Sequence, residues 1–259
     1  MKKTFFLIFL YFITSWSSYS QEITLTRVEP PFWWTGFKNP ELQVLVYGKN
    51  IGKTDPSVYS QGIELQRVHV MDNPDYLFLD IVISKNAEPG SFPISFYKDG
   101  KKVTEYLFEL KGREEGSAAR KSFDASDVIY LIMPDRFSNG DPGNDNPAGF
   151  LEKTDRSNPD GRHGGDIKGI LNHLDYIKDL GATAIWINPL LENNMVKYSY
   201  HGYSTTDYYK TDPRFGSNDD YLTLSYYIHQ KGMKLIMDMI FNHCGSQHWW
   251  MADPPTKDW

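Results

Sequence analysis

The sequence predicts two folded parts, an all-β sandwich followed by an α/β part built on a parallel sheet. Two observations predict this division. Residues 22–112 consist of short runs of alternating apolar and polar residues between turn residues, whereas residues 125–259 repeat a strand, loop and helix pattern. Residues 113–124, between them, are small, polar and charged, which is typical of a linker. With 40% hydrophobic and 23% charged residues, the 259-residue chain has the composition of a globular protein.

Residues 1–20 have the pattern of a signal peptide. Lys2 and Lys3 precede a nine-residue apolar run, residues 5–13, and a polar stretch follows it. The run is shorter than the roughly 18 residues that cross a bilayer, so a stable membrane anchor is the weaker interpretation. The sequence therefore predicts an exported protein, periplasmic or secreted. Loss of the two lysines with the leader would change the net charge from −6 to −8, which argues against a nucleic-acid partner.

Apolar residues at every second position predict the strands of the sandwich. Two sets would each share one face of a strand: Leu42, Val44 and Val46, and Leu77, Leu79, Ile81 and Ile83. Asp99-Gly100 separates two further runs, residues 92–97 and 103–108, and predicts a hairpin because such a turn needs positive φ values. Because no helical period interrupts these residues, we expect an all-β sandwich of immunoglobulin-like type.

Three apolar runs separated by two helical patterns predict the α/β part. The expected strands are Val128–Met133, Ala182–Ile187 and Met233–Ile240. The first is continuously apolar, as expected of a parallel strand that is buried on both faces. One helix is expected from Ile167 to Gly181, and a second from Ser217, with Asp220 three residues on, to Gly232. Strands that alternate with helices predict right-handed βαβ units and a parallel sheet.

Carboxylates and amides gather after the first expected strand. Five such side chains lie within eleven residues: Asp135, Asn139, Asp141, Asn144 and Asp145. Oxygen ligands in a flexible loop suit calcium, whereas a turn in which these side chains bond their own backbone would use the same residues. On spacing alone the turn is favoured, because the register is not that of an EF-hand loop.

The third expected strand ends in polar residues that suit a sugar. Asp238, Asn242 and His243 lie at its exit, and in parallel α/β folds the working residues lie at the carboxyl ends of strands. Imidazole and carboxylate groups can fix the orientation of sugar hydroxyls. For any one of these residues alone, a helix cap or a structural histidine is the better interpretation.

Several segments, taken in order, resemble the α-amylase family of glycoside hydrolases, most closely its neopullulanase and cyclomaltodextrinase members. Residues 28–36 resemble the start of that branch's N-terminal domain, and residues 129–145 resemble its first barrel strand and loop. The other diagnostic segments are Tyr200-His201-Gly202-Tyr203, Thr206-Asp207-Tyr208, Asp212-Pro213-Arg214-Phe215-Gly216 and the Asp-x-x-x-Asn-His motif from Asp238 to His243. One six-residue motif is weak evidence, but five in the right order are strong.

The resemblance implies a metal site and a substrate site. The implied calcium ligands are Asn139, Asp141, Asn144, Asp145, the Gly164 carbonyl and Asp166. This reverses the preference for a plain turn. Tyr203 is implied to stack on the glucose ring beside the scissile bond, while His201 and His243 bind hydroxyls of that ring. Asp238 is implied to support the site from the strand end.

The resemblance also implies that residues 125–259 are the first three βα units of a (β/α)8 TIM barrel. This barrel is incomplete, because a whole one takes about 250 residues. The open third strand is expected to expose an unpaired edge and an apolar face. The nucleophile and the acid/base are expected beyond Trp259, so we expect no catalytic residue in this chain and no activity from it alone.

The implied partners are α-glucan oligosaccharides such as maltodextrin, cyclodextrin and pullulan. Hydrolysis of α-1,4 links is expected, with α-1,6 links left open, and the full-length parent is expected to form a homodimer. The alternative is a non-catalytic α-glucan-binding protein in which Trp33 and Trp34 of the sandwich lead the binding.

Overall fold

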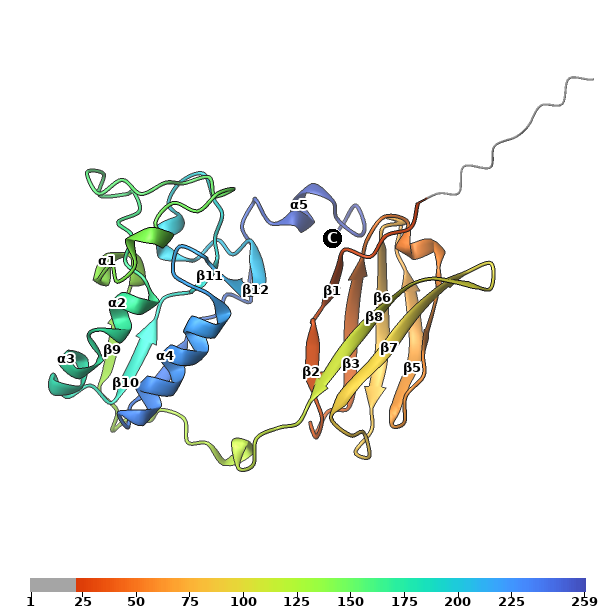
Figure 1. Cartoon of the computed structure of the whole chain (residues 1–259), viewed down its shortest axis with the longest axis horizontal. Coiled ribbons are helices and arrows are strands. Elements are labelled where there is room, and N and C mark those ends of the chain that lie inside the picture. The colour runs from red at the N-terminus through yellow and green to blue at the C-terminus, as the bar shows by residue number, and fades with distance from the viewer. Residues whose placement is uncertain (1–21) are drawn as a thin grey trace, which may run out of the picture.

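The computed structural model describes residues 22–259 and shows two folded parts that lie side by side (Figure 1). The expected signal peptide lies outside the described residues. Residues 113–124 join the two parts at one end, and the C-terminal segment reaches back to the sandwich at the other. Within the described residues, no helix has both the length and the apolar character needed to cross a membrane.

The N-terminal part consists of two four-stranded sheets. The first has the order β1-β3-β6-β5, formed by β1 (Arg27–Glu29), β3 (Glu41–Tyr47), β6 (Tyr76–Ile83) and β5 (Ile63–Val70). The second has the order β2-β8-β7-β4, formed by β2 (Phe32–Trp34), β8 (Lys101–Lys111), β7 (Gly90–Lys98) and β4 (Asp55–Val58). Neighbouring strands are antiparallel except β2 and β8, which are parallel. A short 3-10 helix, η1 (Ile51–Lys53), follows β3.

One apolar core lies between these sheets, as the alternating pattern predicts. Val44 of β3 and Leu79 of β6 are fully buried, and so are Ile94 and Phe96 of β7 in the opposite sheet. The expected hairpin is confirmed, because Asp99 and Gly100 have φ values of 50° and 74° and join β7 to β8. The sandwich is therefore held by apolar side chains from both of its sheets.

The second part contains three parallel strands in the order β13-β10-β9. They are β9 (Ile129–Ile132), β10 (Ala184–Ile187) and β13 (Lys234–Met237). The helices are α1 (Pro134–Phe137), α2 (Ile167–Leu171), α3 (Leu174–Asp179), α4 (Asn218–Gln230) and α5 (Trp249–Ala252). An antiparallel pair, β11 (Leu191–Glu192) and β12 (Asp207–Thr211), follows β10. Three further 3-10 helices are η2 (Ser117–Ala119) in the linker and η3 (Pro142–Asn144) and η4 (Ser199–His201) in the α/β part.

The two expected helices of the α/β part had different outcomes. The second is confirmed as α4, whose first turn carries the expected capping box between Ser217 and Asp220. The first is wrong as a single helix, since it is divided into α2 and α3. The His173 amide bonds to the Ile170 carbonyl, three residues back, and its side chain bonds to the Gly169 carbonyl at 2.7 Å. This tighter turn ends the α-helical bonding pattern.

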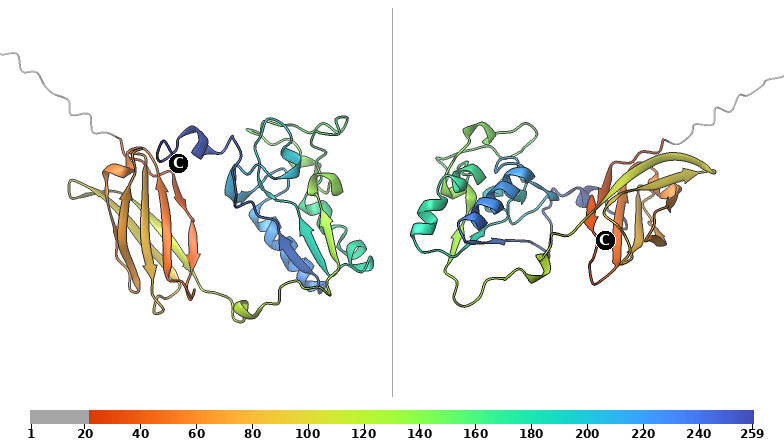
Figure 2. Two further views of the ribbon diagram at one scale, coloured as in Figure 1. Left: turned by 180° about the vertical axis from the view of Figure 1, so that it is seen from behind. Right: turned by 60° about the horizontal axis from the view of Figure 1, so that its bottom comes forward.

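The three-stranded sheet is buried on one face and open on the other. Ile132, Ile185 and Ile187 are at most 1% exposed on the face that α2, α3 and α4 cover. On the opposite face Leu131 is 60% exposed and Trp186 is 40% exposed. The prediction that the first strand is buried on both faces is therefore wrong. The described residues place helices on one side of the sheet only, as Figure 2 shows from two further directions.

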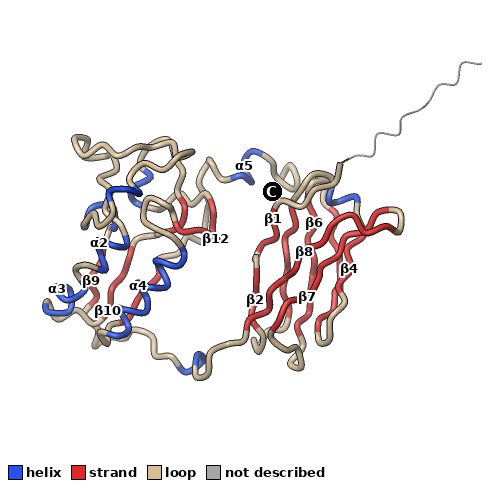
Figure 3. The backbone as a smooth tube through the Cα atoms, in the orientation of Figure 1, coloured by secondary structure: helices blue, strands red, loops and turns tan. Residues whose placement is uncertain are grey.

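The C-terminal segment packs on the outer face of the β1-β3-β6-β5 sheet. The rings of Trp249 and Tyr76 are stacked at 5.7 Å, and the Tyr47 hydroxyl donates to Asp253 at 2.8 Å. At the same boundary Arg27 donates to the buried Asp207 of β12 at 3.1 Å. The two parts are thus in contact at a place far from the linker (Figure 3). No pattern in the sequence indicated this contact.

Candidate functional site

Polar and aromatic side chains converge at the carboxyl ends of the three parallel strands, which we call the rim. The rim consists of Trp186, His201, Tyr203, Asp238 and His243. Asp238 directly follows β13, and one of its oxygens, Oδ2, accepts bonds from the Tyr203 hydroxyl at 2.9 Å and from the Trp186 indole at 3.1 Å. Two donors, Trp186 of strand β10 and Tyr203 of a loop, therefore fix the orientation of this carboxylate.

Tyr203 lies in the loop between β11 and β12 and is held as a proton donor. Burial raises the pKa of Tyr203 to about 12, and its bond to Asp238 adds to this effect. The phenol therefore keeps its proton at neutral pH. The neighbouring Gly202 has a φ value of 85°, and a Cβ there would lie 2.2 Å from the Pro189 carbonyl oxygen, so this turn of the loop requires glycine.

His201 lies beside Tyr203, and its Nε2 is available to a ligand. Its Nδ1 accepts a bond from the Tyr203 amide at 3.0 Å, and the two rings are 5.7 Å apart. Burial lowers the pKa of His201, although Glu152 acts in the opposite direction. A neutral imidazole with Nδ1 as acceptor carries its proton on Nε2, which can then donate to a sugar hydroxyl.

His243 lies against the same loop but is exposed. Its Nε2 lies 3.0 Å from the Tyr203 carbonyl oxygen, so this nitrogen must be the donor, and its own carbonyl accepts from the Tyr208 hydroxyl at 2.6 Å. A sugar hydroxyl would have to use the other nitrogen of the ring or displace the Tyr203 carbonyl. All four predicted substrate residues nevertheless lie together, because Tyr203 contacts each of the other three.

Sequence reasoning missed three residues that shape this rim. Trp186 could have been found, since it lies on the same face of the second expected strand as the strand-end groups. Tyr208 belongs to a diagnostic segment, but nothing in the sequence indicated its bond to His243. Glu152 accepts from the amides of Tyr198 and Ser199, the latter at 2.6 Å, and so holds the loop that leads to His201. Its place in a long irregular loop gave no signal.

A buried network of charges lies among the loops of the rim. Arg214 makes two bonds to Asp212, at 2.9 and 2.7 Å, and neither residue is exposed. Burial opposes ionisation of Asp212, but its bonds with Arg214 outweigh this, and the pKa of Asp212 lies below its usual value. Arg162 is equally buried, 3.7 Å from Asp135, and burial lowers its pKa. Two acids and two bases thus compensate one another.

The six residues implied to bind calcium lie in two neighbouring segments, residues 139–145 and 164–166, which we call the oxygen-rich loop. Asp166 accepts from the backbone amides of Gly140, Asp141 and Gly169, the last of these at 2.6 Å. Asp141 accepts from the Gly143 amide at 3.0 Å. Part of this loop is therefore the self-bonded turn that spacing alone favoured.

Other oxygens of the oxygen-rich loop have no such partner. The Oδ1 atoms of Asn139 and Asn144 are buried and accept no hydrogen bond. Gly164 has a φ value of 84°, and a Cβ there would lie 2.3 Å from an oxygen of Asp145. Unsatisfied oxygens beside carboxylates fit a hard cation such as calcium. Within residues 22–259, no group of three or more His, Cys, Asp or Glu side chains is spaced to bind a metal, so such an ion would need amide and carbonyl oxygens in addition to carboxylates.

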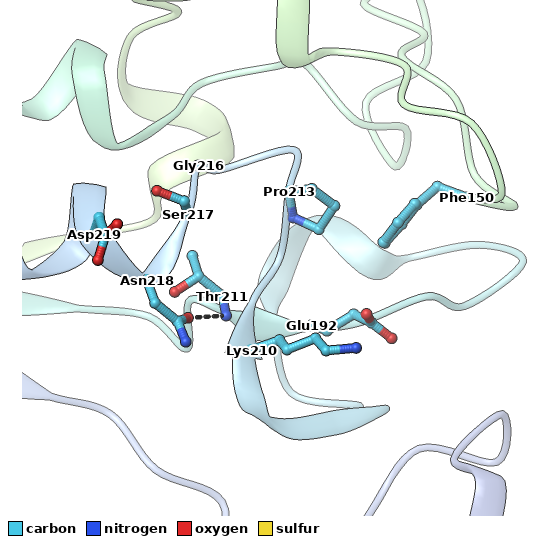
Figure 4. A pocket seen from close by; sticks show the side chains of 9 residues that line it. All are labelled: Phe150, Glu192, Lys210, Thr211, Pro213, Gly216, Ser217, Asn218 and Asp219. Atoms are coloured by element: carbon cyan, nitrogen blue, oxygen red, sulfur yellow. Dashed lines mark hydrogen bonds between the residues drawn. The ribbon is translucent and has the colours of Figure 1, made fainter. Parts of the chain in front are cut away.

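A separate pocket of about 420 Å³ lies at the start of α4 (Figure 4). Phe150 and Pro213 form one side, Glu192 and Lys210 lie opposite, and Asn218 accepts from the Thr211 amide at 2.8 Å. None of the rim residues lines it. We assign no function to this pocket.

Comparison with known proteins identifies both parts of the chain. Residues 131–258 match the α-amylase catalytic domain, and residues 27–114 match the cyclomaltodextrinase N-terminal domain. A cyclomaltodextrinase from Thermoanaerobacter pseudethanolicus is 42% identical over 118 residues, which are 46% of this chain and 20% of that protein. Neopullulanase 2 from Thermoactinomyces vulgaris is 40% identical over 131 residues, 50% of this chain and 22% of that protein.

A solved structure of an Anoxybacillus α-amylase is 45% identical, with a TM-score of 0.47, and the match covers 51% of this chain and 28% of that one. The chain spans about a fifth of the length of the cyclomaltodextrinase and neopullulanase relatives that it matches. It carries the N-terminal domain of that branch and part of the catalytic domain. The chain therefore belongs to the α-amylase family of glycoside hydrolases, with the cyclomaltodextrinases and neopullulanases among its relatives.

Proposed function

We propose that this chain supplies the substrate-binding rim of an exported α-glucan hydrolase of the cyclomaltodextrinase and neopullulanase type. The observation that carries this proposal is the convergence of His201, Tyr203, Asp238 and His243 at the strand ends. The Tyr203 ring offers an apolar face for a glucose ring, and the Nε2 of His201 offers a donor for a hydroxyl. Because sugars are neutral, binding needs orientation rather than charge.

The proposed reaction is hydrolysis with retention. It requires two carboxyl groups about 5 Å apart, one as nucleophile and one as acid and base. We place both groups on strands that follow the three described here, in a (β/α)8 barrel of which these are the first units, behind an immunoglobulin-like sandwich. Residues 22–259 would then bind α-glucans without cleaving them. Asp238, fixed by Tyr203 and Trp186, would orient a hydroxyl rather than attack the sugar.

The proposed substrates are maltodextrin, cyclodextrin and pullulan, with α-1,4 links as the main target and α-1,6 links as a further one. The names cyclomaltodextrinase and neopullulanase among the relatives support this choice. The leader pattern of residues 1–20 supports export, and a relative named periplasmic α-amylase, from Escherichia coli, is 36% identical over 129 residues. A homodimer of the full-length parent is part of the same proposal.

Calcium is proposed as the metal of the oxygen-rich loop. Asn139, Asp141, Asn144, Asp145, Asp166 and the Gly164 carbonyl would hold it. The ion would supply positive charge to a cluster of oxygens and so fix the loop after β9 against the turn before α2. The unbonded Oδ1 atoms of Asn139 and Asn144 support this proposal.

Binding of maltoheptaose to the whole chain tests the proposal. Isothermal titration should detect binding, Tyr203→Ala should weaken it at least tenfold, and no reducing ends should appear. Tyr226→Ala is the matched control, because Tyr226 lies on the outer surface of α4 and is 58% exposed. Unchanged binding by Tyr203→Ala would remove the rim from the site.

The same titration separates the alternative, glucan binding by the sandwich. Trp33 packs partly against the sandwich core and its ring contacts Trp34, which favours a structural role for both. Trp34→Ala should therefore leave maltoheptaose affinity within about twofold of the parent, a difference near 0.4 kcal/mol. Loss of binding in Trp34→Ala but not in Tyr203→Ala would favour the alternative.

A further inference from the structure

Arg156 lies beside the oxygen-rich loop and contacts both of its segments. Its Nη2 donates to Asp145 Oδ2 at 3.0 Å, and its Nε donates to the His163 carbonyl at 2.8 Å. Asp145 ends the first segment, and His163 immediately precedes the second. The guanidinium therefore links the same two segments that a bound calcium ion would link.

The space around Gly164 shows how closely these groups approach. A Cβ on this glycine would lie 2.3 Å from Asp145 Oδ1, 2.9 Å from Arg156 Nη2 and 3.0 Å from Asn139 Nδ2. A carboxylate, a guanidinium and an amide thus converge on one backbone position. Asn139 also donates to Asp145 Oδ1 at 2.8 Å, which turns its own Oδ1 away from the carboxylate and leaves it unbonded.

Asp145 and Arg156 differ in exposure. The Asp145 side chain is 10% exposed, whereas the Arg156 side chain is 56% exposed. A carboxylate that is removed from water needs a positive partner, and Arg156 is the cation that the chain provides. Arg156 can move into solvent, because more than half of its side-chain surface is already exposed, whereas Asp145 cannot. The pair is therefore stable in the absence of metal, and it can be broken by movement of Arg156 alone.

A cation bound by the same carboxylate changes the balance. Calcium would place two positive charges within a few ångströms of the guanidinium, where like charges repel strongly in a partly buried setting. Both cations would stabilise Asp145, but each would weaken the other.

We propose that Arg156 is a substitute cation for the oxygen-rich loop. It binds Asp145 and orders the loop while no metal is present, and it lowers the affinity of the loop for calcium. This inference rests on the proposed calcium site. Calcium occupancy would then depend on competition between Arg156 and the ion for Asp145, and not on the six ligands alone.

Calcium titration of the whole chain tests the inference together with melting in EDTA. Arg156→Ala should bind calcium about tenfold more tightly than the parent, because the repulsive charge is gone. The same variant should melt at a lower temperature in EDTA, because Asp145 loses its partner. Arg156→Ala should therefore raise the calcium affinity and lower the melting temperature in EDTA. If Arg156 only supported the loop, its removal would lower both the affinity and the melting temperature.

Two further variants define the cause. Arg156→Lys keeps the charge and should bind calcium within about threefold of the parent, a difference near 0.7 kcal/mol. Arg120→Ala removes an exposed arginine that pairs with Glu114 in the linker, and it should change neither measurement. If Arg156→Ala does not fold, Arg156→Gln, which keeps a polar contact without the charge, should give the same pair of shifts.

Each outcome decides between the site and the inference. Calcium binding by the parent with equal or weaker binding by Arg156→Ala would overturn the role of Arg156 and leave the calcium site in place. Binding by the variant alone would support both. No binding by either chain would overturn both.

Discussion

The two parts of this chain are stabilised by different buried groups. In the sandwich the fully buried side chains are apolar, such as Val44, Leu79 and Phe108. In the α/β part the largest fully buried side chains are two arginines, Arg162 and Arg214, paired with Asp135 and Asp212. A sandwich of alternating strands can close its core from local pattern alone. The irregular loops of the rim depend instead on buried charged groups, and Arg214 donates to the carbonyls of Asn193 and Glu152, which are far from it in sequence.

The largest effect is expected from breaking the charge network. Arg214→Ala leaves Asp212 buried without its bidentate partner, and should lower the free energy of unfolding of the α/β part by about 4 kcal/mol. Hydrogen exchange of residues 190–216 would measure this loss. Arg120→Ala removes an exposed salt bridge in the linker and should lower the free energy of unfolding by less than about 1 kcal/mol. Equal costs would mean that burial does not set the strength of these pairs.

One substitution made in both parts sharpens the comparison. Leu79→Ala should destabilise the sandwich by about 3 kcal/mol, because the cavity it leaves lies between two sheets. Leu131→Ala in β9 should cost no more than about 0.5 kcal/mol, because Leu131 is 60% exposed. Urea unfolding followed by hydrogen exchange would separate the two parts. A large cost for Leu131→Ala would show that the open face of the sheet is covered in solution.

The boundary between the parts should respond to acid through His248. Burial lowers the pKa of His248 to about 4, and its Nδ1 accepts from the Trp250 amide at 3.2 Å. The unfolded chain takes up this proton near pH 6.5, so the stability that the neutral ring contributes is fully present above that pH. It is lost as pH falls from about 6.5 to about 4, by roughly 3 kcal/mol in total.

Melting temperatures measured between pH 4 and pH 7 would check this dependence. His248→Gln removes the titrating group and should flatten that part of the curve. A slope that survives in His248→Gln would assign the acid sensitivity to other groups.

Apart from the exposed controls Arg120→Ala and Leu131→Ala, the smallest loss of stability is expected at the first turn of α4. Ser217→Ala removes one half of the capping box with Asp220 and should destabilise the helix by about 1 kcal/mol. Ser217→Thr keeps the hydroxyl and should cost less. Exchange rates of the first amides of α4 would detect the difference, and faster exchange in both variants alike would point to packing rather than capping.

Local pattern predicted much of the fold. Alternation located the strands of the sandwich, turn chemistry located the Asp99-Gly100 hairpin, and the capping box located α4. The division of α2 from α3 was missed, because the Gly169 carbonyl bond to His173 is invisible to an apolar period. Burial of the first strand was misjudged for a similar reason, since an apolar run does not say whether a second layer is present.

The candidate site was predictable only in part. Placing polar groups at strand ends brought Asp238 and His243 to the rim, and the resemblance added His201 and Tyr203. The bond between Trp186 and Asp238 and the salt bridge between Arg156 and Asp145 join residues 52 and 11 positions apart. Contacts of this kind depend on loop paths, for which single-residue patterns carry little information. The calcium and glucan roles remain predictions.

The sandwich and the α/β part are joined twice, by residues 113–124 at one end and by the packing of Trp249 on Tyr76 at the other. The two parts are thus joined by the backbone at one end and by this contact at the other. A single proteolytic cut in the linker would therefore not separate them, and they would elute together in gel filtration until denaturant disrupted the packing of Trp249 on Tyr76. Once both parts have folded, an intact linker is therefore not needed to keep them together.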